Sequence, residues 1–289
     1  MRSPVHRRSK PEASSGPEAA KEDDGGIWGT VRFILGLALL AWAIRSFLFA
    51  PFSIPSGSML PTLYIGDYLM VAKWPYGYSS VSFPFGFPSF DGRVLGNAPK
   101  RGDVVVFRHP SEPTDLIKRV IGIPGDTVEV RDGRVVLNGR LLALKEVEPA
   151  QLPISPNTPC KTVPPATPRL SQQGGKTMCQ YRAYREVLPG GVTHIVLDQV
   201  EGGSADNFAP TQVPPGHVFL MGDNRDDSLD SRFSAAEGGI GMVPIDRLIG
   251  RAMFTFWSTD GSAGYLLPWT WFTALRADRI GNGYSESSQ

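Results

Sequence analysis

Three short segments of the sequence combine reactive side chains with the proline and glycine residues of tight turns. Residues 52–63 (FSIPSGSMLPTL) hold two serines around a glycine, between two prolines that restrict the chain, and Ser58 is the second of these serines. Residues 115–126 place Lys118 in an apolar, strand-like run, and residues 222–232 (GDNRDDSLDSR) collect carboxylates, arginines and serines. Each segment alone fits an ordinary turn, a solvated lysine or a salt-bridged loop. Together they offer a nucleophile and a base.

A serine hydroxyl becomes a nucleophile when a neighbouring base takes its proton. None of the four histidines lies in a distinctive polar motif, so a serine–histidine–aspartate triad has no support. A lysine in apolar surroundings has its pKa lowered, by as much as about 3–5 units when fully buried, and then acts as a neutral base near pH 7. The residue types therefore favour a Ser58 nucleophile with a Lys118 base.

No pattern of metal ligands accompanies these residues. The sequence holds no HExxH motif and no cluster of histidines and cysteines, so we expect no metal ion and no other cofactor. Asp226, Ser228, Asp230 and Glu237 match ligand positions of a calcium loop, but Ser231 stands where that loop needs glycine. The balance of 29 basic and 28 acidic side chains argues against a nucleic-acid partner, which would require a strongly basic face.

A long apolar run precedes these motifs. Residues 27–50 hold no charge between Arg32 and Arg45, and the 23 residues from Ile27 to Phe49 can cross the ~30 Å hydrocarbon core as a helix if both arginines reach toward the headgroups. A cleavable signal peptide and a buried core helix are the alternatives. Because the polar leader is long for a signal peptide and no small-x-small cleavage site follows the run, we expect an uncleaved transmembrane anchor over 27–50.

The arm at residues 1–26 is rich in polar residues and proline without periodicity, and we expect it to be disordered. It carries five basic residues, whereas the first basic residue after Arg45 is Lys73. This asymmetry predicts a cytoplasmic N-terminus and an exterior location for the rest of the chain. An oxidising exterior favours a disulfide between Cys160 and Cys179, and two free buried thiols are the alternative.

Beyond the anchor the pattern is that of a mainly β protein. Six segments are enriched in β-branched and aromatic residues, as strands are: 67–74, 103–109, 127–142, 193–198, 217–223 and 251–257. Asp132-Gly133 and Asn138-Gly139 predict tight hairpins. The seven prolines of residues 149–168 exclude a central strand, so we expect a long surface insertion there, tied by the cysteine pair.

Aromatic residues gather in residues 74–90 and 265–272. Part of these rings belongs in cores, and the remainder, beside proline and glycine, is typical of loops at a membrane interface. We therefore expect these loops to contact a phospholipid bilayer.

The three segments, in this order behind an anchor, closely resemble the bacterial type I signal peptidases, also called leader peptidases. PSGSMLPTL, IKRVIGIPGD and GDNRDDSLDSR carry the resemblance, which runs from about residue 33 to about residue 281. It implies a membrane-bound serine endopeptidase of the bacterial inner membrane, with a periplasmic catalytic domain. Its substrates would be preproteins that emerge from the export machinery, and it would remove their signal peptides by cutting after small residues at A-x-A sites.

The resemblance assigns catalytic roles by position. Ser58 matches the nucleophile, and Lys118 matches the general base. Ser56 matches the side chain that joins the Ser58 backbone N–H in the oxyanion hole. Ser228 matches the serine that hydrogen-bonds and orients the lysine, and a supporting charged pair follows it, formed by Asp230 and Arg232.

The resemblance also implies the substrate pockets and the domain plan. Shallow pockets for small side chains, at the first and third positions before the cut, would be lined by Ile54, Pro55, Val106 and Ile117. The fold would be a single N-terminal transmembrane helix followed by a β-rich catalytic domain, residues 51–128 and 215–289. A smaller β-domain, residues 129–214, would be inserted between them and carry the proline-rich loop.

The sequence departs from the family pattern at two places. Position 227 is Asp where Asn is commoner, and we expect the Asp227 side chain to be solvated. After Phe233, the sequence SAAEGGIG lengthens the loop before Met242. A catalytically silent, membrane-anchored β-module that binds a partner protein is the alternative, but such a module would not need the complete set of serines and lysine.

Overall fold

The computed structural model describes residues 26–264 and 266–284, so the predicted disordered arm lies outside the described residues except for Gly26. α1 (Ile27–Ala43) continues as a π-helical turn, η1 (Ile44–Leu48). Together they span 22 residues with a mean hydropathy of 1.8, and within the described ranges this is the one helix long and apolar enough to cross a membrane. The helix ends at Leu48, and Phe49 and Ala50 belong to a strand, so the bounds 27–50 of the membrane anchor stay a prediction.

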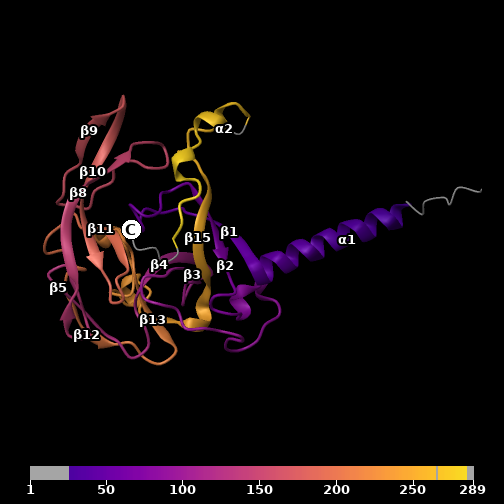
Figure 1. Ribbon diagram of the computed structural model, residues 1–289, viewed down its shortest axis with the longest axis horizontal. Helices are drawn as coiled ribbons and strands as arrows, with labels where there is room; N and C mark the ends of the chain where they lie inside the picture. Colours follow the sequence, from indigo (N-terminus) through magenta and orange to yellow (C-terminus); the bar gives the residue numbers. More distant parts are fainter. Residues whose placement is uncertain (1–25, 265, 285–289) are drawn as a thin grey trace, which may run out of the picture. The chain divides into compact units, whose positions relative to one another are not determined.

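The chain divides into two compact units between Ala41 and Trp42, and every strand belongs to the second unit. The largest of its three sheets has seven strands in the order β1-β2-β15-β3-β4-β13-β14 (Figure 1). Each neighbouring pair is antiparallel. The bounds are β1 (Phe49–Ser53), β2 (Asp67–Ala72), β3 (Val104–Arg108), β4 (Asp115–Gly122), β13 (His217–Met221), β14 (Val243–Pro244) and β15 (Leu248–Ser258).

Two four-stranded sheets complete the unit, in the orders β12-β5-β6-β7 and β11-β10-β8, with β9 also pairing with β10. Their strands are β5 (Thr127–Arg131), β6 (Arg134–Leu137), β7 (Arg140–Leu141), β8 (Ala143–Pro153), β9 (Arg169–Gln173), β10 (Lys176–Val187), β11 (Thr193–Leu197) and β12 (Phe208–Gln212). The short helices are η2 (Ser80–Ser82), η3 (Pro84–Gly86), η4 (Arg225–Asp227), η5 (Ala235–Glu237), η6 (Ile245–Arg247), α2 (Thr270–Thr273) and η7 (Ala277–Arg279).

The mainly β fold behind one N-terminal apolar helix is confirmed. Each of the six predicted segments contains at least one strand, and both predicted hairpins are present. Asp132 and Asn138 adopt positive φ angles of 49° and 52°, as the two-residue hairpin turn requires of its first central residue. Turn chemistry and β-propensity therefore located most of the strands correctly.

The proline-rich segment is partly in a strand. Residues 149–153 complete β8, which lies at the edge of its sheet. Its pairing with β10 shifts register between Tyr181 and Ala183, opposite Pro149. A proline is tolerated at such an edge bulge because no ladder hydrogen bond is lost there. The exclusion of a central strand was right, but the surface insertion begins later than predicted.

The hydrophobic cores cross the predicted domain boundary. One buried cluster joins Ile121 and Phe219 of the largest sheet to Val128, Val130 and other side chains from β5 and β6. A second cluster packs Leu60, just after Ser58, against residues of β8, β10 and β11. The division into residues 51–128 with 215–289, and 129–214, therefore stays a prediction.

The two aromatic segments are split between core and surface. Tyr76 and Phe83 are buried, whereas Phe85 and Phe87 are fully or largely exposed. In the second segment, Tyr265 lies outside the described residues, and the exposed side chains include Leu266, Trp269, Trp271 and Phe272.

Candidate active site

Apolar side chains anchor the turn that carries Ser58 in the hydrophobic core. It follows β1, and Met59 and Leu63 are fully buried in the core under the largest sheet. Backbone hydrogen bonds from Leu60 N to Gly57 O (3.1 Å) and from Leu63 N to Met59 O (2.9 Å) close two successive turns. The chain therefore presents Ser58, which is only 7% exposed, from a rigid support.

Lys118 reaches Ser58 from β4, where it pairs in register with Val105 of β3. Its Nζ donates a hydrogen bond to Oγ of Ser58 at 2.6 Å and another to the carbonyl oxygen of Ile117 at 3.2 Å. Burial lowers the pKa of Lys118 to about 8, although the carboxylates of Asp230, Asp223 and Asp227 oppose that shift. The structure thus brings together a hydroxyl and an amine that is neutral in a large fraction of molecules near pH 8.

Ser56 lies on the exposed side of Ser58. Its Oγ is 3.4 Å from Oγ of Ser58, and either hydroxyl can donate in that contact. A hydroxyl at this position can turn toward an oxygen that develops negative charge beside Ser58.

The loop after β13 packs directly on the Ser58 turn. A Cβ on Gly222 would lie 2.3 Å from Oγ of Ser228 and 2.5 Å from the carbonyl oxygen of Ser58, so no other residue fits there without displacement. Asn224 donates hydrogen bonds from its backbone N to Ser58 O and from its Nδ2 to Gly57 O, both at 3.1 Å. These contacts fix the backbone of the nucleophile, and sequence reasoning did not assign Asn224 this role.

The structure brings Asp230 and Arg232 together beneath the loop. Nε and Nη2 of Arg232 donate to the two carboxylate oxygens of Asp230 at 2.8 and 2.9 Å, and Gly222 N donates to the same carboxylate at 3.0 Å. Burial would raise the pKa of Asp230, but the guanidinium and the backbone N–H hold it below its ordinary value. The pair therefore stays ionised and ties residue 222 to residue 232.

Ser228 is buried beside the same cavity as Ser58 and Lys118. Its hydroxyl makes no hydrogen bond to Lys118 in this geometry. The expected hydrogen bond between these two side chains is thus not formed here, and the role of Ser228 in orienting Lys118 stays a prediction.

A second buried ion pair was not anticipated. Arg119 donates from Nε and Nη2 to the two oxygens of Asp223 at 2.8 and 2.7 Å, and Thr62 Oγ1 donates to Asp223 at 2.6 Å. Asp223 precedes Asn224, and Arg119 follows Lys118. This network therefore links the strand of the base, the loop after β13 and the Ser58 turn.

The predicted pocket residues fall into two groups. Ile54, Val106 and Ile117 are buried in one cluster with Met59 and Leu63, next to the catalytic pair. Pro55 is exposed and lines a cavity of about 280 Å³ that reaches Ser58. A larger cavity of about 560 Å³ contains both Ser58 and Lys118. The role of the four residues as substrate pockets stays a prediction.

Two further expectations concern the insertion. The structure joins Cys160 to Cys179 by a disulfide, with the two Cα atoms 5.3 Å apart. Asp227 is not simply solvated, because its carboxylate forms an ion pair at 2.5 Å with Nζ of Lys161, the residue after Cys160. The sequence contained no signal for this contact, since the two residues are 66 positions apart.

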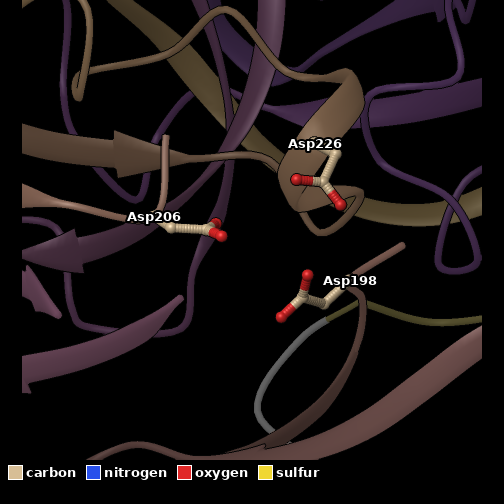
Figure 2. Close-up of side chains that lie close together, drawn as sticks. All are labelled: Asp198, Asp206 and Asp226. Carbon is tan, nitrogen blue, oxygen red and sulfur yellow. The ribbon is translucent and has the colours of Figure 1, made fainter. Parts of the chain in front are cut away.

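Three carboxylates converge near the larger cavity, those of Asp198, Asp206 and Asp226 (Figure 2). Backbone N–H groups already serve two of them: Gln199 N donates to Asp226 at 2.6 Å and Gly203 N donates to Asp206 at 2.8 Å. Burial and the two neighbouring carboxylates raise the pKa of Asp198 to about 6. Backbone donors thus offset part of the repulsion among these carboxylates. Asp226 thus points to these neighbours and not into the calcium loop considered above.

Known proteins with similar sequences share most of this chain. The family model described as signal peptidase, peptidase S26, matches residues 27–257. Signal peptidase I of Rickettsia felis is 33% identical over 274 residues, which cover 88% of this chain and 90% of that protein. Signal peptidase I of Pseudomonas aeruginosa is 38% identical over 223 residues, covering 74% of this chain and 66% of that protein.

A solved signal peptidase I from Enterococcus faecalis is 23% identical and covers 54% of this chain and 97% of its own. Its TM-score is 0.27, and we draw nothing from that overlay.

Proposed function

Because this chain belongs to the signal peptidase I family, peptidase S26, we propose that Ser58 and Lys118 perform its peptidase reaction as a serine–lysine pair. A member of this family is an enzyme that removes signal peptides, and the apolar helix Ile27–Leu48 fits a membrane anchor. One observation carries the proposal: the 2.6 Å contact between Nζ of the buried Lys118 and Oγ of Ser58.

Acylation begins when Lys118 is neutral and accepts the hydroxyl proton of Ser58. Oγ then attacks the scissile carbonyl carbon, and the new Oγ–C bond forms a tetrahedral intermediate. The ammonium of Lys118 returns the proton to the leaving amine as the C–N bond breaks. The product is an acyl-enzyme on Ser58, and the mature protein leaves with a free N-terminus.

Deacylation repeats this sequence with water. Lys118 takes a proton from water, the resulting hydroxide attacks the acyl carbon, and Oγ of Ser58 leaves with the proton that Lys118 returns. In both steps the oxygen of the intermediate would accept hydrogen bonds from the Ser58 backbone N–H and the Ser56 hydroxyl. A single donor of this kind typically contributes about 3 kcal/mol to the transition state.

We assign the pockets for small substrate side chains to the buried Ile54, Val106 and Ile117, with Pro55 at the surface. Shallow apolar pockets of this kind admit alanine and exclude longer residues, which supports cleavage after A-x-A sequences. The substrates we propose are preproteins that carry such signal peptides, presented as they emerge from the export machinery.

We further propose a placement in the bacterial inner membrane, with the N-terminus in the cytoplasm and residues after the anchor outside. The excess of basic residues before the helix supports this orientation. Exposed aromatic and aliphatic side chains, among them Phe85, Phe87 and Trp269, support contact with the phospholipid bilayer.

The test compares cleavage of a preprotein in detergent by the wild type, Ser58→Ala and Lys118→Ala. We expect both variants to lose cleavage by several orders of magnitude while their circular dichroism spectra stay unchanged. Mass spectrometry after exposure to a serine-reactive acylating inhibitor should place the adduct on Ser58 in the wild type. Cleavage that persists in either folded variant would contradict the mechanism, and a wild type that neither cleaves nor acylates would favour the silent binding module.

A further inference from the structure

Two cavities meet at the nucleophile. The larger contains Ser56, Ser58 and Lys118, and the smaller contains Ser56 and Ser58 together with Pro55 and Gly57. A peptide whose scissile bond lies at Ser58 must continue away from it in two directions. The chain therefore offers space on both sides of that bond.

The segment around Cys160, residues 158–164, contributes to both cavities. Val163 and Pro164 line the larger, whereas Thr158, Pro159 and Lys161 line the smaller. With the exception of Lys161, these are short, uncharged side chains. They suit contacts with the backbone and small side chains of an extended peptide, and not recognition of a charged group.

Several contacts hold residues 158–164 in place. Cys179 is buried in β10 and bonds to Cys160, and the hydroxyl of Tyr181, from the same strand, donates to the carbonyl oxygen of Lys161 at 3.0 Å. On the other side of Cys160, Thr158 accepts a hydrogen bond from Nη2 of Arg276 at 3.0 Å. The backbone of Ala166 closes a turn onto Val163 O at 2.9 Å. The segment is thus fixed in place before any peptide arrives.

The ion pair between Lys161 and Asp227 sits at the junction of the two cavities. Asp227 lines both of them and immediately precedes Ser228. The side chain of Lys161 is two-thirds exposed, so the pair adds little to folding stability. It joins the segment 158–164 to the loop that carries Ser228.

We propose that residues 158–164, held by the Cys160–Cys179 disulfide and the Lys161–Asp227 ion pair, form a wall of the peptide-binding cleft and determine specificity for substrate residues beyond the two small pockets. The occupant is an extended, uncharged stretch of the substrate peptide next to the scissile bond. This inference rests on the proposed function for the identity of that peptide. It assigns to the insertion a part in substrate selection.

A binding experiment tests the wall separately from catalysis. In the full-length Ser58→Ala enzyme, Val163 is replaced by the photo-crosslinker p-benzoylphenylalanine, and the enzyme is irradiated with a preprotein in detergent. Leu116, which lines the larger cavity, serves as the positive control position. Leu170, on β9 and 59% exposed, lines neither cavity and serves as the negative control. We expect crosslinks from positions 163 and 116 and none from 170.

Kinetics give a second readout with intact Ser58. Val163→Trp should raise KM about tenfold for a long peptide that extends past both small pockets, with little change in kcat and a smaller effect on a short peptide. Leu170→Trp should change neither. Lys161→Ala should raise KM for the long peptide, and Lys161→Arg should restore it because the ion pair is kept.

Different results would overturn the peptide-binding wall and the proposed catalytic mechanism. If the wild type cleaves the preprotein and position 116 crosslinks but position 163 does not, the wall is overturned and the enzyme's function stands. If position 163 crosslinks while the wild type fails to cleave, the peptide-binding wall stands and the proposed catalytic mechanism is overturned. Equal changes in KM for Val163→Trp and Leu170→Trp would also overturn the wall.

Discussion

Burial alone does not make a lysine into a catalytic base in this protein. Lys73 is as buried as Lys118, and burial lowers the pKa of Lys73 to about 8 as well. Its Nζ, however, donates to the carbonyl oxygen of Ser82, which has no proton to give. Lys118 differs because its partner is a hydroxyl, so only this lysine can exchange a proton with a nucleophile.

The lowered pKa of Lys118 predicts the pH dependence of cleavage. Only the neutral amine accepts the Ser58 proton, so kcat/KM should rise through about pH 8 and fall about tenfold per unit below it. Steady-state kinetics on a peptide substrate between about pH 6 and 10 would measure this limb. A profile that is flat across that range would rule out a lysine base.

The lowered pKa of Lys118 also predicts that this residue reduces the free energy of unfolding at neutral pH. The pKa of Lys118 falls from 10.5 to about 8 on folding, so between these values the unfolded chain binds the extra proton and stability rises with pH. Below pH 8 the folded protein must hold a buried ammonium. Lys118→Met should therefore raise the free energy of unfolding by up to about 3 kcal/mol below pH 8.

Urea unfolding of residues 42–289 at several pH values would measure the difference between Lys118→Met and the wild type. The gain should shrink as the pH rises from about 8 to above 10.5, where Lys118 is neutral in the folded chain and in the unfolded chain as well. A gain that is independent of pH would show that packing, and not the charge, is responsible.

Strand β4 and the loop after β13 support the catalytic pair through charges that lie deep in the protein. Arg119 and Asp223 are almost fully buried and hold each other through two hydrogen bonds. Removing one partner of a buried pair leaves an uncompensated charge, which is far more costly than losing the same contact at the surface.

We therefore expect Asp223→Asn to lower the free energy of unfolding by about 3–5 kcal/mol, because Arg119 loses its counter-charge. The matched control is Asp115→Asn, on the same strand as Arg119. Its ion pair with Arg108 is one-third exposed on both sides, so the loss should be about 0–1 kcal/mol. Similar losses in the two variants would contradict the argument from burial.

Gly222 sets how closely the loop approaches the nucleophile. Gly222→Ala would place a methyl group against the Ser58 backbone and Ser228, so the loop must move away from the catalytic pair. We expect a loss of kcat of at least about tenfold together with a loss of stability, because one of these contacts is with backbone. Gly283→Ala is the control, since its nearest contact would be an ordinary 3.7 Å. Unchanged kcat in Gly222→Ala would show that the approach is not needed.

The sequence was sufficient to predict the catalytic-site residues that lie in a recognisable motif. It was insufficient for contacts between residues that share no motif. Ser58, Lys118 and the Asp230–Arg232 pair carry a recognisable pattern, and strands with alternating or β-branched residues were located. Strand β10 was missed because arginine, glutamine and lysine interrupt its apolar residues. Ion-pair partners such as Lys161 and Asp227 depend on distances in the folded chain, and residue type alone does not select one lysine among many.

The boundary between the two compact units predicts how the anchor contributes to activity. A chain of residues 42–289 retains all the strands and the catalytic pair. It should cleave a soluble peptide with a kcat similar to that of the full chain. It should process a preprotein in lipid vesicles at least about tenfold more slowly, because anchoring raises the local concentration of enzyme and substrate in the membrane.

Time courses with the two chains at equal concentration, on the peptide and on the vesicle-bound preprotein, would measure both effects. Equal rates on vesicles would show that the helix makes no contribution to substrate encounter. A loss on the peptide as well would mean that the helix supports the fold of the second unit.

The position of β15 in the largest sheet also sets the order in which a newly made chain can become active. Among the strands that the structure describes, β15 is the last to leave the ribosome, yet it lies between β2, which follows the Ser58 turn, and β3, which pairs with the strand of Lys118. Until residues 248–258 arrive, the strands on either side of it have no shared hydrogen-bond ladder to bring nucleophile and base together. We therefore expect the largest sheet to close around the catalytic pair only after residues 248–258 have been made.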